Sequence, residues 1–240
     1  NNKQNLKLME KIFHKGVCGI LEHKSFDEIV IMVHGYSSHK NTVALEKAAK
    51  ILDISSLRID MDNKGELGKL TVTDYVKKVD IAVEFVKKEG YKKIDLMGTS
   101  SGGMICMASA LKHDINKLFL RAPSSNYAKQ CEYNKSEERM KEWKKKGFII
   151  RKKKDGTEYK CYYTFYEDAK NYVMEDKVKN IKCPVMIIHG DKDEEIPLEH
   201  SEKLSFPNVK LHVIKGASHN LGVDGDWDEG FRIMKEFFYN

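Results

Sequence analysis

The stretch that decides the fold of this chain reads Lys93-Ile94-Asp95-Leu96-Met97-Gly98-Thr99-Ser100-Ser101-Gly102-Gly103-Met104. Its apolar start has the character of a buried strand, and the apolar run over 104–111 predicts a helix directly after it. Ser100 then stands at the apex of a sharp turn. Gly98 and Gly102 flank this serine, as is required where a strand and a helix crowd closely behind an exposed side chain. The pattern G-x-S-x-G therefore predicts a nucleophile elbow, a turn that presents a reactive serine.

The length and composition predict one substantial domain. The chain has 240 residues, 41% of them hydrophobic, which is enough for a sizeable core. Its formal net charge of +6 comes from lysines mixed with many carboxylates, without the signatures of a nucleic-acid module. No window approaches the roughly 18 apolar residues of a membrane span, and the polar start lacks the apolar core of an export signal. We expect a cytoplasmic protein with neither a nucleic-acid partner nor a membrane span.

The cysteines suggest neither a disulfide framework nor a metal site. Five are scattered along the chain: Cys18, Cys106, Cys131, Cys161 and Cys183. Their number is odd, and no two of them have C-x-x-C spacing. This usage fits a reducing compartment.

Strand-like and helix-like patterns alternate along the chain. Short apolar, β-branched runs predict buried strands at 29–33, 57–59, 94–97, 118–120, 185–188 and 211–214. Helical patterns lie between or after them, at 42–52, 72–89, 103–112 and 227–238. This alternation predicts an α/β fold with a mostly parallel, doubly wound sheet. The segments 11–13 and 17–21 predict an antiparallel hairpin at its edge, turning across Gly16.

The alternation breaks between Pro123 and about Asn180, where charge is dense. Segments 148–150 and 159–165 flank the turn Lys154-Asp155-Gly156, and Asp-Gly between alternating segments is a strong hairpin signal. We expect an inserted cap with a helix and a β-hairpin over residues 123–180. The core is then formed by residues 1–122 and 181–240.

A nucleophilic serine needs a histidine base, and that histidine needs a carboxylate to hold its tautomer. The loop after the strand that ends at Ile188 offers four acids: Asp191, Asp193, Glu194 and Glu195. His219 follows the next strand, so it belongs to the same carboxyl edge of the sheet. The other histidines nearby are expected within a strand, at a strand end or on a helix: His212, His189 and His200. His219 is therefore the best candidate for the base.

Two backbone N–H groups are needed to bind the negative charge that develops during acyl transfer. One is expected from Ser101, directly after the nucleophile. The other is expected from the loop after the strand that ends at Val33, where Gly35 lets the backbone turn and the N–H of Tyr36 points inward.

These motifs resemble those of α/β-hydrolases over nearly the whole chain, most closely the small capped esterases that include cinnamoyl and feruloyl esterases and monoacylglycerol lipases. The matching motifs are His34-Gly35-Tyr36, Gly98-Thr99-Ser100-Ser101-Gly102-Gly103, His189-Gly190-Asp191-Lys192-Asp193 with Ile196-Pro197, and Ser218-His219. The resemblance implies the α/β-hydrolase fold. Its pattern H-G-x-x-D-x-x-V-P selects Asp193 rather than Asp191 as the acid. Thr99 departs from the His or Gln that usually precedes the serine.

The resemblance implies a carboxylic ester hydrolase that works through an acyl-enzyme on Ser100, His219 and Asp193, with no cofactor and no metal. Small aromatic or short-to-medium acyl esters are the expected substrates, and homodimerisation is left open. The alternatives are thioester or peptide hydrolysis on the same residues, and a hydrolase fold reused as a non-catalytic ligand-binding module.

The cap side chains have two interpretations each. Its aromatic residues are expected to pack a small core of the cap more than to line a pocket: Tyr127, Tyr133, Trp143, Tyr162, Tyr163, Phe165 and Tyr166. Its basic residues are expected to form a solvated face more than to attract an anionic ester: Lys144, Lys145, Lys146, Arg151, Lys152, Lys153 and Lys154.

Overall fold

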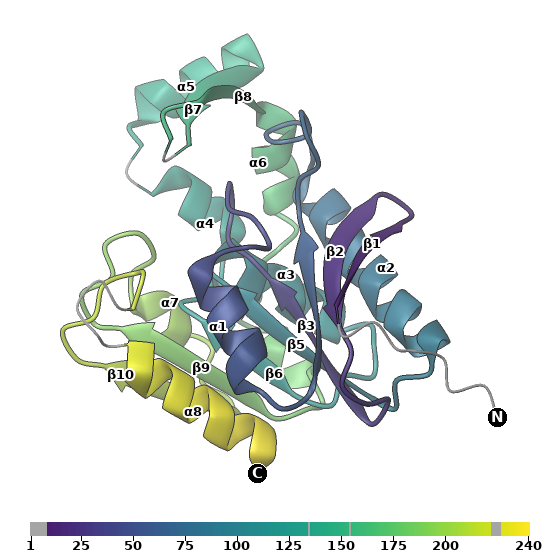
Figure 1. Cartoon of the computed structure of the whole chain (residues 1–240). Helices are drawn as coiled ribbons and strands as arrows, with labels where there is room; N and C mark the ends of the chain where they lie inside the picture. Colours follow the sequence, from purple (N-terminus) through teal and green to yellow (C-terminus); the bar gives the residue numbers. More distant parts are fainter. Residues whose placement is uncertain (1–8, 134, 154, 222–226) are drawn as a thin grey trace.

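The computed structural model describes residues 9–133, 135–153, 155–221 and 227–240. Over these ranges the strands form an eight-stranded sheet of order β1-β2-β4-β3-β5-β6-β9-β10, with helices on both faces (Figure 1). The strands are β1 (Glu10–His14), β2 (Val17–Glu22), β3 (Glu28–Val33), β4 (Ser55–Asp60), β5 (Lys93–Thr99), β6 (Leu118–Arg121), β9 (Val185–Gly190) and β10 (Val209–Ile214). From β4 to β10 the neighbours are parallel, whereas β1 and β2 form an antiparallel edge. The predicted fold class and edge hairpin are confirmed.

Helices cover the two faces of the sheet separately. They are α1 (Val43–Ile51), α2 (Val72–Glu89), α3 (Ser101–Ala110) and α8 (Trp227–Tyr239). Ile31 of β3 packs into one core with residues of α2 and α3, and its neighbour Met32 packs into a second core with residues of α1 and α8. Because both faces are buried, β3 is apolar without interruption from Ile29 to Val33. This is why the strand runs were visible in the sequence.

Elements α4 to α6, which lie between β6 and β9 in the chain, form a layer at one end of the sheet (Figure 1). They are α4 (Tyr127–Glu132), α5 (Glu137–Lys146), β7 (Phe148–Lys152), β8 (Glu158–Tyr162) and α6 (Tyr163–Ala169). The 3-10 helix η1 (Val178–Asn180) precedes β9, and α7 (Glu199–Glu202) follows it. Among the described residues, strands β7 and β8 form a two-stranded antiparallel sheet of their own. The predicted hairpin is therefore present, and Lys154 of its turn lies outside the described residues.

The second strand of this hairpin was predicted too long. It ends at Tyr162, and the residues that follow form α6 instead of continuing to Phe165. The physical reason is burial: Phe165 and Ala169 are both buried, and residues four apart lie on one face of a helix. The backbone N–H of Tyr163 still donates to the carbonyl oxygen of Gly147, in register with the hairpin, before the chain turns into α6.

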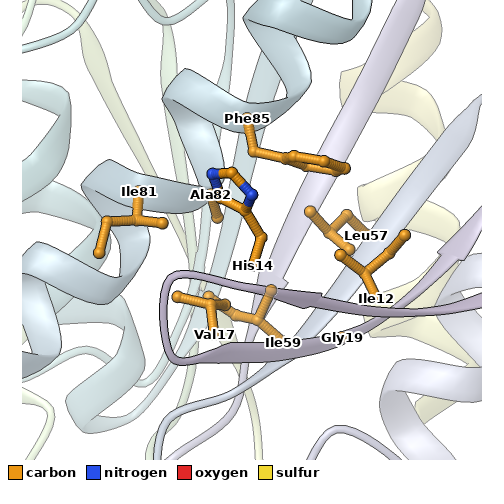
Figure 2. Close-up of a pocket in the computed structure, with 9 residues that line it drawn as sticks. All are labelled: Ile12, His14, Val17, Gly19, Leu57, Ile59, Ile81, Ala82 and Phe85. Carbon is orange, nitrogen blue, oxygen red and sulfur yellow. The ribbon is translucent and has the colours of Figure 1, made fainter.

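A small apolar gap lies under the β1–β2 hairpin, against α2 (Figure 2). Its lining residues are Ile12, His14, Val17, Gly19, Leu57, Ile59, Ile81, Ala82 and Phe85. The volume is about 10 Å³, which is at the lower limit for one water molecule. We therefore regard it as a packing gap and not as a ligand site.

Candidate active site

The predicted sharp turn between β5 and α3 is present and strained at one residue. Ser100 has φ 57° and ψ −125°, a conformation that a residue with a Cβ rarely adopts. The surroundings admit only glycine on either side. A Cβ on Gly98 would lie 2.5 Å from the carbonyl oxygen of Gly102, and a Cβ on Gly102 would lie 2.4 Å from that of His34. The two glycines thus let β5, α3 and the loop after β3 meet directly behind Ser100.

Asp193 and His219 form a buried pair at the carboxyl ends of β9 and β10. His219 Nδ1 lies 2.7 Å from Asp193 Oδ2, and only 7% of His219 and 8% of Asp193 is exposed. Asp193 Oδ1 accepts the backbone N–H groups of Glu195 and Ile196, at 2.9 and 2.8 Å. Since a carboxylate only accepts, Nδ1 of His219 carries a proton, and in the neutral ring Nε2, which lies 3.8 Å from Glu195 Oε2, keeps its lone pair.

His189 is a second partner of Asp193, which the sequence reasoning missed. Its Nε2 lies 3.1 Å from Asp193 Oδ2 and 2.9 Å from the carbonyl oxygen of Ile196, while Nδ1 lies 2.6 Å from Ser201 Oγ. Burial by itself raises the pKa of Asp193, but hydrogen bonds from His189 and His219 outweigh it and hold that pKa well below its usual range. Asp193 is therefore fully ionised at neutral pH.

Ser100 and His219 line the same cleft, whose volume is about 1050 Å³. In the described part of the chain no hydrogen bond joins Ser100 Oγ to His219, an arrangement common in enzymes without bound substrate. Arg121 connects their two loops. Its Nη1 donates to the carbonyl oxygen of His219 at 2.9 Å, and its Nε donates to Thr99 Oγ1 at 3.4 Å. Burial lowers the pKa of Arg121 to about 10, so its guanidinium stays charged near neutral pH.

The loop after β3 packs directly against Ser100. His34 Nδ1 donates to the carbonyl oxygen of Gly35 at 2.7 Å, and Ser38 N–H donates to the same oxygen at 3.2 Å. In a trans peptide the C=O and the next N–H point in opposite directions. The N–H of Tyr36 therefore points away from these donors. Gly35 itself packs against Ser100, because a Cβ there would lie 3.3 Å from Ser100 Cβ.

The two predicted oxyanion donors, the backbone N–H groups of Tyr36 and Ser101, donate no hydrogen bond within the described ranges. His34 Nε2 accepts the N–H of Met61 at 3.0 Å. Burial lowers the pKa of His34 to about 4. The imidazole is therefore neutral at physiological pH and holds the loop with one donor and one acceptor.

A sequence profile of the prolyl oligopeptidase family, Peptidase S9, matches residues 60–239. The chain belongs to the prolyl oligopeptidase family. It is 26% identical over 216 residues to the mitochondrial palmitoyl-protein thioesterase ABHD10 of Mus musculus, a match that covers 82% of this chain and 70% of that protein.

This prolyl oligopeptidase family member also has the same fold as several solved structures. Est1E from Butyrivibrio proteoclasticus with ferulic acid bound has a TM-score of 0.81 at 23% identity, covering 96% of this chain and 98% of that one. The monoacylglycerol lipase of Paleococcus ferrophilus has a TM-score of 0.74 at 18% identity, covering 95% and 98%. The α/β-hydrolase fold that the motifs predict is confirmed.

The cleft of this family member receives side chains from the layer between β6 and β9. Tyr127 and Phe165 line it, whereas Trp143 packs within that layer and donates its Nε1–H to the carbonyl oxygen of Cys161 at 2.9 Å. The expectation of a uniformly solvated basic face is wrong for Arg151 and Lys153, because both line the cleft. The other described basic residues of that set are exposed: Lys144, Lys145, Lys146 and Lys152.

Two further observations concern ligands and membranes. Within the described ranges, no three His, Cys, Asp or Glu side chains converge to form a set that could hold a metal ion. No helix in the same ranges is long and apolar enough to cross a bilayer.

Proposed function

We propose that this chain is a carboxylic ester hydrolase with Ser100 as nucleophile, His219 as general base and acid, and Asp193 as the group that orients His219. The observation that carries the proposal is the buried Asp193–His219 pair, with its 2.7 Å contact, beside the same cleft as the strained Ser100. This pairing fixes the tautomer that leaves His219 Nε2 able to accept a proton.

The proposed reaction has two halves. Ser100 Oγ attacks the ester carbonyl carbon while its proton passes to His219 Nε2. The N–H groups of Tyr36 and Ser101 bind the oxyanion of the tetrahedral intermediate. The intermediate collapses as His219 returns the proton to the leaving alcohol, which gives an acyl-enzyme. Water then attacks the acyl carbon with His219 as base, and the acid and free Ser100 are released.

We propose that residues 123–180 cap a core of residues 1–122 and 181–240, and that the cap selects the substrate. Tyr127 and Phe165 supply aromatic surface to the cleft, 5.5 Å apart between ring centroids, and Phe165 lies 5.2 Å from the ring of Tyr36. Such a lining favours small aromatic or short-to-medium acyl esters.

A second candidate is thioester hydrolysis on the same residues. The likeness to a palmitoyl-protein thioesterase over 82% of the chain favours it. Both reactions pass through the same acyl-enzyme, so they differ only in the leaving group.

A substrate panel separates these candidates. It contains p-nitrophenyl esters of increasing acyl length, methyl ferulate, palmitoyl-CoA and a prolyl peptide, each assayed with the wild type and Ser100→Ala. We expect the highest kcat/KM on an oxygen ester and its loss in Ser100→Ala. A peak on palmitoyl-CoA with negligible ester turnover would replace the esterase proposal by the thioesterase one. Inactivity on the whole panel would favour a ligand-binding module.

A further inference from the structure

Two basic side chains of the cap region lie together at the cleft. Arg151 belongs to β7, and Lys135 precedes α5; both line the cleft that Ser100 lines. The guanidinium carbon of Arg151 lies 5.2 Å from the ring centroid of Tyr36. Arg151 therefore lies over the ring of Tyr36, the residue whose backbone N–H is a proposed oxyanion donor.

In the part of the chain that the structure describes, no carboxylate forms an ion pair with either cation, although Lys152 beside Arg151 pairs with Glu158 at 3.1 Å. Lys135 Nζ donates to the carbonyl oxygen of Cys131. The groups that surround Arg151 electrostatically are phenols and thiols, which carry no charge at neutral pH: Tyr36, Tyr159, Cys131 and Cys161.

The two cations also act on each other. Burial lowers the pKa of Lys135, and the nearby charge of Arg151 lowers it further. Removing cations from water without an anion is costly. The cost falls when an anion enters. Lys153 lines the cleft as well, but its charge acts on Asp62 and helps to keep that carboxyl ionised.

We propose that Arg151 and Lys135 bind a negatively charged group of the substrate, so that the preferred esters carry a carboxylate separated by a short spacer from the scissile carbonyl. This inference rests on the proposed ester hydrolysis at Ser100. The planar fork of Arg151 matches a carboxylate with two parallel hydrogen bonds, and Lys135 adds a third donor. Tyr36 sets the distance between the scissile carbonyl and the carboxylate, since its backbone N–H is a proposed oxyanion donor and its ring contacts Arg151.

A pair of matched substrates tests this. Mono-p-nitrophenyl adipate carries a terminal carboxylate, and p-nitrophenyl adipamate carries a neutral amide of the same shape; suberate analogues extend the spacer. We expect wild-type kcat/KM to favour the anionic member by about tenfold or more, as charge-assisted hydrogen bonds allow. Arg151→Gln and, separately, Lys135→Gln should each lower the anionic-to-neutral ratio several-fold, mainly through KM. Lys152→Gln, on the same strand but exposed, should keep the wild-type ratio.

The anionic-to-neutral ratio of kcat/KM is insensitive to general damage to the site, because a loss of packing on Tyr36 lowers the turnover of both substrates alike. A wild-type ratio near one, or a ratio unchanged in both variants, overturns the anion subsite. Hydrolysis of the neutral ester that survives in Ser100→Ala would instead overturn the proposed function, so the two failures are distinguishable.

Discussion

Gly190 lies where the loop that carries Asp193 contacts the loop that carries His219, and alanine at this position should push the two loops apart. A Cβ on Gly190 would lie 2.1 Å from the carbonyl oxygen of Ala217, whereas ordinary contact begins at 3.4 Å, so 1.3 Å must be made up by movement. His219 follows Ala217 by two residues, and its Nδ1 lies 2.7 Å from Asp193 Oδ2. If the loop moves by the full shortfall, the pair opens to about 4 Å and its hydrogen bond is lost. A misplacement of about 1 Å at a reacting group costs about 100-fold in rate.

The assay for Gly190→Ala is kcat on the best p-nitrophenyl ester, with far-UV circular dichroism and a thermal melt to verify folding. Overpacking of this kind should also cost about 1–3 kcal/mol of stability. Gly216→Ala is the matched control on the same loop. Gly216 has φ +76° with nothing within 4 Å of its Cβ position, so alanine adds strain of about 1–2 kcal/mol without displacement and should leave kcat nearly intact. A folded Gly190→Ala enzyme with wild-type kcat would refute the reasoning.

Three further predictions concern buried charged or titratable groups. Burial lowers the pKa of His34 from 6.5 to about 4. The contribution of neutral His34 to the free energy of unfolding is therefore complete above pH 6.5 and falls by about 3 kcal/mol as the pH drops towards 4. Urea unfolding should show a smaller difference in stability between wild type and His34→Gln at pH 4.5 than at pH 7.5. Burial raises the pKa of Asp95 to about 8. Its carboxyl group ionises more readily in the unfolded chain, so the folded state loses stability as the pH rises from 3.8 to 8. Asp95→Asn should therefore raise Tm more at pH 9 than at pH 5, and an equal change at both pH values would contradict this. Arg121→Met removes the bonds to the His219 carbonyl and to Thr99 and should lower kcat about tenfold or more, with a smaller change in KM in steady-state assays.

Local patterns predicted the elements that are determined by local chemistry. The helix predicted at 72–89 has those bounds in the structure, because Thr71 and Asp74 form a capping box at its start and Gly90 ends it with φ 98°. The central strands were recognisable because both of their faces are buried. The elbow was recognisable because Gly98 and Gly102 are demanded by contacts that no other residue tolerates.

Contacts between distant segments could not be predicted in this way. Arg151 precedes three lysines in the sequence and resembles a solvated charge, but its environment is set by Tyr36 from the loop after β3. Asp191 and Asp193 are equivalent by position. In the structure Asp191 Oδ1 accepts the N–H of Gly216 at 2.6 Å, whereas Asp193 Oδ2 lies 2.7 Å from His219 Nδ1. The contact of His189 with Asp193 likewise depends on how the loop folds back.

Covalent labelling of Ser100 tests the central claim most directly. The wild type, Ser100→Ala and Ser101→Ala are each treated with a fluorophosphonate, and the adduct is located by mass spectrometry of the intact chain and its peptides. The account predicts one adduct on Ser100 in the wild type, none in Ser100→Ala, and retained labelling in Ser101→Ala, whose backbone N–H is unaltered. Labelling of Ser100→Ala at the wild-type stoichiometry, or an adduct on another residue of the wild type, would contradict it.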